Sequence, residues 1–331
     1  MAAFPHTRMR RMRQADWARR LARVQSLSVD DLVRPLFVSD SADRREAIAN
    51  LPGQDRLDVA RLVEEAQRTF ELGIPAVALF PQIREADKSG DGREAANPEG
   101  LVQRAVRELK RAVPELAVIT DAALDPYTSH GHDGVMDGAR IVNDATVEVL
   151  SEVAVSLADA GADVIAPSDM MDGRVGAIRA ALDAKGHTDA AILSYAAKYA
   201  SGFYGPYRDA IGTSAALVGD KRTYQMDPLR REEALREVGL DIDEGADMVM
   251  VKPGLPYLDI MRDIRDAYGV PTLAFQVSGE YAMIRAAGER GMIDEKRVIL
   301  ESLMSFKRAG CAGVFTYFAD RAAQWIAAGD L

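Results

Sequence analysis

Two apolar segments of the sequence, AAILSYAAK (190–198) and ADMVMVKPG (246–254), each carry a lysine where a hydrophobic run ends. Both runs are continuously apolar rather than alternating, which is typical of parallel strands that are covered on both faces. An ammonium group at the end of a buried strand is costly, because desolvation favours the neutral amine. The two segments therefore predict neighbouring strands of a parallel sheet and, in Lys198 and Lys252, two unusual amines.

Six further apolar runs have the same character, and amphipathic stretches separate most of the eight. These six runs span residues 33–40, 74–81, 116–124, 161–169, 271–279 and 311–319. Several of the amphipathic stretches end in a glycine just before the next run, as expected where a helix closes in the left-handed conformation. These glycines are Gly73, Gly161, Gly245 and Gly310. Eight strand–helix units predict an α/β fold, a (β/α)8 barrel. A doubly wound open sheet is the alternative, but no G-x-G-x-x-G motif follows the first run.

The composition restricts the class of protein. The chain has 331 residues, of which 48% are hydrophobic and 28% charged, and no apolar run approaches the roughly 18 residues of a membrane span. A formal charge of −10 argues against a nucleic-acid partner. The single cysteine, Cys311, leaves no internal disulfide or thiolate cluster, which fits a reducing compartment. We therefore expect a cytoplasmic protein with neither a membrane nor a nucleic acid as partner.

The N-terminus departs from the acidic balance. Residues 1–24 contain seven arginines and one acid, Asp16. Arginine-rich starts occur in transit peptides, but this one lacks their serine richness. We interpret residues 1–30 as a basic arm that contacts another subunit and residues 31–331 as the barrel. A solvated basic tail is the alternative.

Active sites of (β/α)8 barrels lie where the strands end, so the polar residues at these ends form a candidate site. They are Asp121, Asp125, Ser168, Asp169, Lys198, Lys252, Ser278 and Tyr317. The segment 201–228 that follows the fifth run is long and rich in glycine and aromatic residues, and we predict that it forms a lid.

The paired lysines suggest covalent chemistry. Neighbouring strands lie about 5 Å apart, so two ammonium groups there would repel each other and each would lower the pKa of the other. Neutral lysines form Schiff bases with carbonyl substrates. The alternative for either lysine alone is a charge that caps a strand end in solvent.

Three further groups of side chains have two interpretations each. His130 and His132 lie beside carboxylates and could bind a divalent metal, or they fix their loop by hydrogen bonds, which we favour. Either the lid residues bind a substrate carboxylate or they remain solvated. These residues are Arg208, Lys221 and Gln225. Ser278 and Tyr317 either form hydrogen bonds to another substrate carboxylate or bind only the local backbone.

Long motifs in the sequence resemble those of the porphobilinogen synthase (5-aminolevulinate dehydratase) family from about residue 7 to the end. The motifs are TSHGHDG, PSDMMDGR, YAAKYASGFYGPYRDA, TYQMDP, MVKPGLPYLDI, QVSGEYAM, LESLMSFKRAG and TYFA. The resemblance implies a barrel that assembles into a homo-octamer or hexamer. It also implies condensation of two molecules of 5-aminolevulinate to porphobilinogen with loss of two waters, in tetrapyrrole biosynthesis.

Carried over motif by motif, the resemblance assigns roles to individual residues. Lys252 would bind the first substrate and Lys198 the second, each as a Schiff base. The carboxylate of the second substrate would meet Arg208, Lys221 and Gln225, and that of the first would meet Ser278 and Tyr317. The predicted catalytic residues are Lys252, Lys198, Asp121, Asp125 and Asp133. The predicted substrate-binding residues are Arg208, Lys221, Gln225, Ser278, Tyr317, Ser168, Phe203 and Tyr204.

The resemblance also bears on metals. The zinc-dependent branch of the family carries three cysteines at positions that are Ala123, Asp125 and Asp133 here, and oxygen ligands disfavour zinc. We therefore expect the aspartate-rich, non-zinc type, without an organic cofactor.

The resemblance also implies an allosteric magnesium site. Glu237 would be the nearest carboxylate, with Asp172, Asp241 and Arg8 (or Arg10) in the outer sphere. An ordinary exposed helix face and a metal-independent enzyme are the alternatives.

Two other functions would fit part of the pattern. A class I aldolase-type barrel would use one Schiff-base lysine and leave the other dispensable. A catalytically inactive barrel would only bind a ligand, but both lysines and the cationic lid argue against it.

Overall fold

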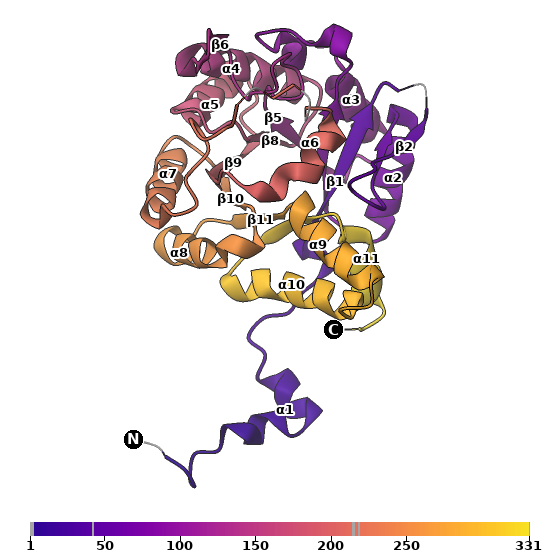
Figure 1. Ribbon diagram of the computed structural model, residues 1–331, viewed down its shortest axis with the longest axis vertical. Coiled ribbons are helices and arrows are strands. Elements are labelled where there is room, and N and C mark those ends of the chain that lie inside the picture. Colours follow the sequence, from indigo (N-terminus) through magenta and orange to yellow (C-terminus); the bar gives the residue numbers. More distant parts are fainter. Residues whose placement is uncertain (1–2, 42, 214–215, 218, 331) are drawn as a thin grey trace.

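A computed structural model describes residues 3–41, 43–213, 216–217 and 219–330, and eight parallel strands form a closed barrel at its centre (Figure 1). The strands are β1 (Leu32–Ser39), β4 (Ala76–Gln82), β5 (Ala117–Ala122), β8 (Val164–Pro167), β9 (Ala191–Lys198), β10 (Met248–Lys252), β11 (Thr272–Gln276) and β12 (Gly313–Thr316). Each of the eight predicted runs contains one of them to within a residue. The last strand pairs with the first, Leu32 with Val314 and Val33 with Phe315. This closure confirms the (β/α)8 barrel and excludes the open sheet.

Helices surround the barrel and connect its strands (Figure 1). They are α2 (Val59–Glu71), α3 (Leu101–Ala112), α4 (Asn143–Asp159), α5 (Arg174–Ala184), α7 (Arg231–Asp243), α8 (Leu258–Tyr268), α9 (Ser278–Glu289), α10 (Glu295–Ala309) and α11 (Ala319–Ala327). Gly245 and Gly310 follow α7 and α10 with φ of 108° and 102°, as the helix-end pattern predicted. Apolar side chains fill both the barrel interior and the space between strands and helices, so the strands are covered on both faces.

Short elements lie in the connections between the strands and helices. The longest of them is the helix α6 (Gly205–Ile211), which belongs to the predicted lid. An antiparallel pair, β2 (Arg45–Ala47) and β3 (Asp55–Leu57), extends the sheet beside β1, and β6 (Met136–Asp137) pairs with β7 (Arg140–Ile141). The 3-10 turns are η3 (Glu85–Asp87), η4 (Arg93–Ala96), η5 (Gly202–Tyr204) and η6 (Leu255–Tyr257).

The predicted arm projects away from the barrel (Figure 1). It contains η1 (Met9–Arg13) and α1 (Asp16–Leu21), and η2 (Val29–Asp31) leads into β1. Trp17 and Leu21, four residues apart on α1, are 68% and 75% exposed and lie on one face of the helix. The division at residues 1–30 and 31–331 stays a prediction, and its first and last residues lie outside the described part of the chain. None of the helices in that part has the length and apolar character that a membrane span needs.

Candidate active site

The two lysines singled out by the sequence are cross-strand partners. Lys198 ends β9, Lys252 ends β10, and the parallel register pairs one directly with the other. Both side chains are buried, with 5% and 4% of their residue surfaces exposed. The structure therefore brings together the two amines that the sequence could place only on consecutive strands.

A bulge in β9 determines which way Lys198 points. From Ser194 to Ala197 the strand advances three residues, while its partner β10 advances two, from Val249 to Val251. Side chains alternate between the faces of a strand, and one extra residue reverses that alternation. The bulge therefore allows Lys198 to reach the barrel mouth on the same side as Tyr195, although the two are three residues apart.

Aromatic rings enclose the ammonium group of Lys252. Its Nζ lies 4.5 Å from the ring centre of Phe275, 5.0 Å from Tyr207, 5.1 Å from Tyr195 and 5.6 Å from Tyr204. Burial and the charge of Lys198 lower the pKa of Lys252 to about 7. The predicted repulsion is thus confirmed for Lys252, and a large share of this amine is neutral near pH 7.

Lys198 has polar surroundings instead. Its Nζ donates a hydrogen bond to the carbonyl of Ser168 and lies 3.8 Å from Oδ1 of Asp133. The difference between the two lysines is therefore one of environment, with a carbonyl and a carboxylate around one and aromatic rings around the other.

Lys221 crosses from the lid to two aspartates of the segment after β5. Its Nζ lies 3.0 Å from Oδ2 of Asp125 and 2.8 Å from Oδ2 of Asp133. Burial acts to raise the pKa of Asp133, but Lys198 and Lys221 outweigh it and lower that pKa to about 2. Burial and the neighbouring Asp133 raise the pKa of Asp125. This triad gives the site one aspartate that stays ionised and one that holds its proton more readily.

Asp121 lies on β5 in the same group of charges. Burial raises its pKa to about 7, while Lys198 and Lys252 act in the opposite direction. Its Oδ1 is buried and has no hydrogen-bond partner among the described residues. A carboxyl group of this kind can exchange a proton near neutral pH.

Most of the predicted site residues line a narrow cavity at the strand ends. It is lined by Asp125, Ser168, Lys198, Tyr204, Tyr207, Arg208, Lys221, Gln225 and Lys252. The lid segment 201–228 covers it with η5 and α6, although residues 214–215 and 218 of this segment lie outside the described residues. The hydroxyl of Tyr204 bonds the carbonyls of Tyr199 and Lys252, which ties the lid to both lysine-bearing strands.

The two residues predicted to bind the carboxylate of the first substrate differ in their present contacts. Ser278 begins α9, and its Oγ accepts a hydrogen bond of 2.9 Å from the backbone of Tyr207 and lies 3.4 Å from the carbonyl of Phe203. Tyr317 follows β12, and its buried hydroxyl has no partner among the described residues. Tyr317 thus offers an unused donor inside the barrel.

The two histidines of the segment after β5 make local contacts. His130 Nε2 lies 3.1 Å from the carbonyl of Gly90, and His132 Nδ1 lies 3.0 Å from the hydroxyl of Tyr224. In the described part of the chain, no three His, Cys, Asp or Glu side chains are grouped as metal ligands would be. These contacts favour the loop-fixing interpretation.

The predicted magnesium residues are only partly together. Glu237 and Asp172 line one cleft beside the lid, and burial and the nearby Asp241 raise the pKa of Glu237. Asp241 acts on Glu237 but is not among the residues that line that cleft. It is buried, and both of its oxygens accept hydrogen bonds from Arg174, at 3.0 and 3.1 Å. Asp241 thus already binds Arg174, its place in the outer sphere of a magnesium site stays a prediction, and Arg8 directly precedes η1 on the arm.

Sequence reasoning missed the rings around Lys252. Tyr195, Tyr207 and Phe275 were not assigned to the site, although all three are buried. Two of them belong to the strand segments that carried the argument, but an aromatic residue in an apolar run is usually core. Only the closed barrel shows that they meet one amine.

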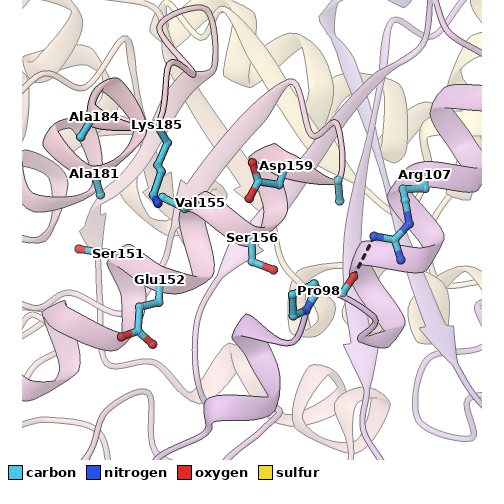
Figure 2. A pocket seen from close by; sticks show the side chains of 11 residues that line it. Pro98, Arg107, Ser151, Glu152, Val155, Ser156, Asp159, Ala181, Ala184 and Lys185 are labelled. Atoms are coloured by element: carbon cyan, nitrogen blue, oxygen red, sulfur yellow. Dashed lines mark hydrogen bonds between the residues drawn. The ribbon is translucent and has the colours of Figure 1, made fainter.

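A separate cavity lies in the outer helix layer, between α3, α4 and α5 (Figure 2). Val155, Ala181 and Ala184 form part of its wall, and Arg107 at its edge donates a 2.8 Å hydrogen bond to the carbonyl of Pro98. None of the predicted site residues lines this cavity. The chemistry is therefore concentrated at the strand ends.

Comparison with known proteins agrees with this geometry. A family model described as delta-aminolevulinic acid dehydratase matches residues 6–325. The chain belongs to this family. The delta-aminolevulinic acid dehydratase of Bradyrhizobium diazoefficiens is 56% identical over 317 residues, covering 96% of this chain and 90% of the relative. That of Rhodobacter capsulatus is 52% identical over 325 residues and covers 98% of each chain.

A solved structure supports the same relationship. The delta-aminolevulinic acid dehydratase of Toxoplasma gondii, in complex with its product porphobilinogen, is 50% identical with a TM-score of 0.94. The alignment covers 96% of this chain and 91% of that one. The predicted reaction is thus confirmed: the chain is a lyase that condenses two molecules of 5-aminolevulinate to porphobilinogen in tetrapyrrole biosynthesis. These relatives give no support to the aldolase or the inactive barrel.

Proposed function

We propose that Lys252 and Lys198 are the two Schiff-base residues of this dehydratase, with the first substrate on Lys252 and the second on Lys198. The observation that carries the proposal is the pairing of two buried lysines across β9 and β10. The pKa of Lys252, lowered to about 7, gives it a neutral fraction that an ordinary lysine lacks at this pH. The first imine therefore forms on the amine surrounded by aromatic rings.

The reaction follows from two such imines. Each lysine attacks the ketone of one 5-aminolevulinate, and each ketone oxygen leaves as water. The substrate on Lys198 loses a proton beside its imine, and the resulting enamine carbon attacks the imine carbon held by Lys252. The amino group of the first substrate then attacks the imine carbon on Lys198 and displaces that lysine. Release of Lys252 and loss of a final proton give the aromatic ring, and holding both substrates in one cavity supplies much of the acceleration.

Two sets of side chains bind the substrate carboxylates in this proposal. Arg208, Lys221 and Gln225 bind that of the second substrate, and all three line the cavity beside Lys198. Ser278 and Tyr317 bind that of the first substrate, and the unpaired buried hydroxyl of Tyr317 supports this role. Ser168 and Tyr204 line the same cavity, and Phe203, the neighbour of Tyr204 in η5, is proposed to contact substrate with them.

Proton transfer falls to the aspartates. Asp121, with a pKa raised to about 7 by burial, is suited to accept and return a proton at neutral pH. Asp125 supports it, because burial and Asp133 raise the pKa of Asp125 as well. Asp133 stays ionised and stabilises the cations on Lys198 and Lys221.

The enzyme is proposed to use neither zinc nor an organic cofactor. The positions that carry cysteines in the zinc-dependent branch are Ala123, Asp125 and Asp133 here, and they offer two carboxylates and no thiolate. The ammonium of Lys221 lies between the two carboxylates, so the chain supplies its own cation there. A donor set of this kind does not fit zinc. Magnesium is proposed only at Glu237 in the separate cleft, with Asp172, Asp241 and an Arg8 from a neighbouring subunit in the outer sphere.

The enzyme is proposed to form a homo-octamer or a homo-hexamer in which the arm, residues 1–30, contacts a neighbouring subunit. Trp17 and Leu21 are exposed on α1, and an arm with apolar side chains and seven arginines suits an acidic, partly apolar surface. We place the enzyme in the cytoplasm, because its single cysteine is buried and unpaired and fits a reducing compartment. Its small-molecule partner is 5-aminolevulinate.

One experiment tests the central assignment. The protein is incubated with 5-aminolevulinate, pyrrole formation is followed with an Ehrlich-type reagent, and borohydride-trapped peptides are mapped by mass spectrometry. We expect pyrrole, together with reduced adducts on both Lys252 and Lys198. An adduct confined to one lysine in an active enzyme would contradict the two-imine mechanism. Titration with EDTA and rescue by magnesium, in wild type and Glu237→Gln, then tests the metal proposal.

A further inference from the structure

A buried carboxylate of α9 joins the turn after Lys252 to the turn before Ser278. Glu280 is nearly fully buried. Its Oε1 accepts a 2.7 Å hydrogen bond from the backbone of Leu255, and its Oε2 accepts one of 3.2 Å from Gly254. Oε2 also accepts a 2.7 Å bond from the backbone of Val277.

These three bonds reach two different strand ends. Gly254 and Leu255 follow Lys252 by two and three residues at the end of β10. Val277 lies between the end of β11 and Ser278. The bond to Val277 is the ordinary one for a glutamate in the first turn of a helix, but the other two have no such local explanation.

We propose that Glu280 is a positioning residue that sets the separation between Lys252 and Ser278. The inference rests on the proposed function, in which Lys252 holds the ketone carbon of the first substrate and Ser278 helps to hold its carboxylate. In 5-aminolevulinate two methylene groups separate these two groups. Glu280 therefore selects a 4-oxo acid by fixing the backbone at both of its ends.

The surroundings of Glu280 favour this role over a purely stabilising one. A carboxylate that accepts three backbone N–H groups is rigid, because both oxygens are engaged. Close packing restricts the same helix turn further: a Cβ on Gly279 would lie 2.5 Å from the carbonyl oxygen of Phe203. The start of α9 thus has little freedom relative to the lid and to the turn after Lys252.

The test uses two ketones that differ only in the carboxylate. Levulinate is a 4-oxo acid, and 2-pentanone is an uncharged methyl ketone of the same chain length. Each is incubated with the full-length protein, reduced with borohydride, and quantified as an adduct on Lys252 by peptide mass spectrometry. Both ketones need the same neutral amine, so their ratio reports how well the carboxylate site is aligned with Lys252.

Glu280→Gln is the principal variant. The amide keeps the size of the side chain but presents an NH2 group to a backbone N–H, so the turns lose part of their connection. We expect the levulinate preference on Lys252 to fall at least tenfold. The matched control is Asp58→Asn, which makes the same acid-to-amide change at the start of α2, where Asp58 accepts a 2.7 Å bond from the backbone of Arg61. The control should keep the wild-type ratio.

The outcomes separate the inference from the proposed function. A wild-type protein without a levulinate preference would overturn the carboxylate assignment and the Glu280 inference with it. A wild-type preference that Glu280→Gln retains would overturn the Glu280 inference alone. Should the glutamine variant fail to fold, Glu280→Asp keeps the charge but is one methylene too short to reach both turns. The aspartate variant should lose the preference too, and a wild-type ratio in it would reject the inference.

Discussion

Lys198 and Lys252 are register partners at the carboxyl ends of β9 and β10, yet they lie in opposite environments. The amine of Lys252 is surrounded by four aromatic rings, whereas that of Lys198 contacts the carbonyl of Ser168 and approaches Asp133. An aromatic enclosure offers a cation less stabilisation than water does, so it favours the neutral amine. Two chemically identical side chains can therefore bind two identical substrates in a fixed order.

Replacing Lys198 by methionine should raise the pKa of Lys252. The charge of Lys198 is, after burial, the main cause of the lowered pKa of Lys252, so its removal shifts this pKa upward from about 7. Borohydride trapping of levulinate on Lys252, measured from pH 6 to 10, should then reach its half-maximum at a higher pH than in wild type. Lys185→Met, which removes an exposed lysine at the end of α5, is the control and should leave the profile unchanged. An unshifted profile in the Lys198 variant would contradict the electrostatic coupling.

Replacing Lys252 by methionine should stabilise the protein while it abolishes activity. Below pH 7 the folded state holds a buried ammonium among aromatic rings, and the unfolded chain does not bear this cost. The free energy of unfolding should rise by about 0.5–2 kcal/mol at pH 6, as is common when a group kept for function at the expense of stability is replaced. Because the unfolded lysine titrates near 10.4, the gain should shrink as the pH rises from 7 towards 10. Thermal denaturation across this range measures it, and a loss of stability at pH 6 would refute the argument.

The barrel could be predicted from the sequence because its strands are continuous apolar runs and its helices end in glycine. Lys198 and Lys252 could be found because a charge at the end of such a run is rare. The bulge between Ser194 and Ala197 could not be predicted, since an extra residue is defined only against the register of β10. Without it, Lys198 would point away from the barrel mouth.

Contacts between segments that are distant in the sequence could not be predicted either. Lys221 was assigned to a substrate carboxylate from its charge and its place in the lid. That it lies between Asp125 and Asp133, about 90 residues earlier, depends on how the lid folds back over the barrel. The ion pair of Asp241 with Arg174 was missed for a related reason, because the two residues belong to different helices, α7 and α5.

Lys221→Met should leave two buried carboxylates without their shared cation. Removing one partner of a buried ion pair typically costs about 3–5 kcal/mol, because the remaining charge is left uncompensated. The pKa of Asp133 should rise, since Lys221 is one of the two cations that lower it to about 2. Chemical denaturation at pH 7 should show the loss, and lowering the pH should reduce it as the carboxylates accept protons. Lys221→Arg keeps the charge and should lose less; equal losses in both variants would point to packing rather than charge.

Deleting residues 1–24 should reduce the mass of the particle in solution. The deleted segment carries the exposed Trp17 and Leu21 together with seven arginines, and the barrel itself begins only with η2 and β1. Light scattering on the deleted and full-length proteins should show a particle of no more than half the original mass. A second variant with glutamine in place of the seven arginines separates charge from apolar contact. An unchanged mass in the deletion would count against a structural arm.

Arg56→Ala should weaken substrate binding from a distance, through α6. Arg56 lies on β3, and its guanidinium donates to the carbonyls of Ala210 and Asp209 at 2.7 and 2.6 Å, at the last turn of the helix that carries Tyr207 and Arg208. A cation at this end also complements the helix dipole. Without it the helix end loses both bonds, and Arg208 is held less firmly in the cavity that it lines together with Lys198.

The expected result is a KM for 5-aminolevulinate raised roughly tenfold or more, since small misplacements of a binding group have large effects. Levulinate trapping on Lys252 should change less than twofold, because β10 rather than α6 carries that lysine. Arg44→Ala removes a more exposed arginine near the same strand pair, one that binds Asp58, and should leave KM unchanged. If Arg56→Ala lowered trapping on Lys252 as strongly as it raised KM, α6 would support the whole site rather than the second substrate alone.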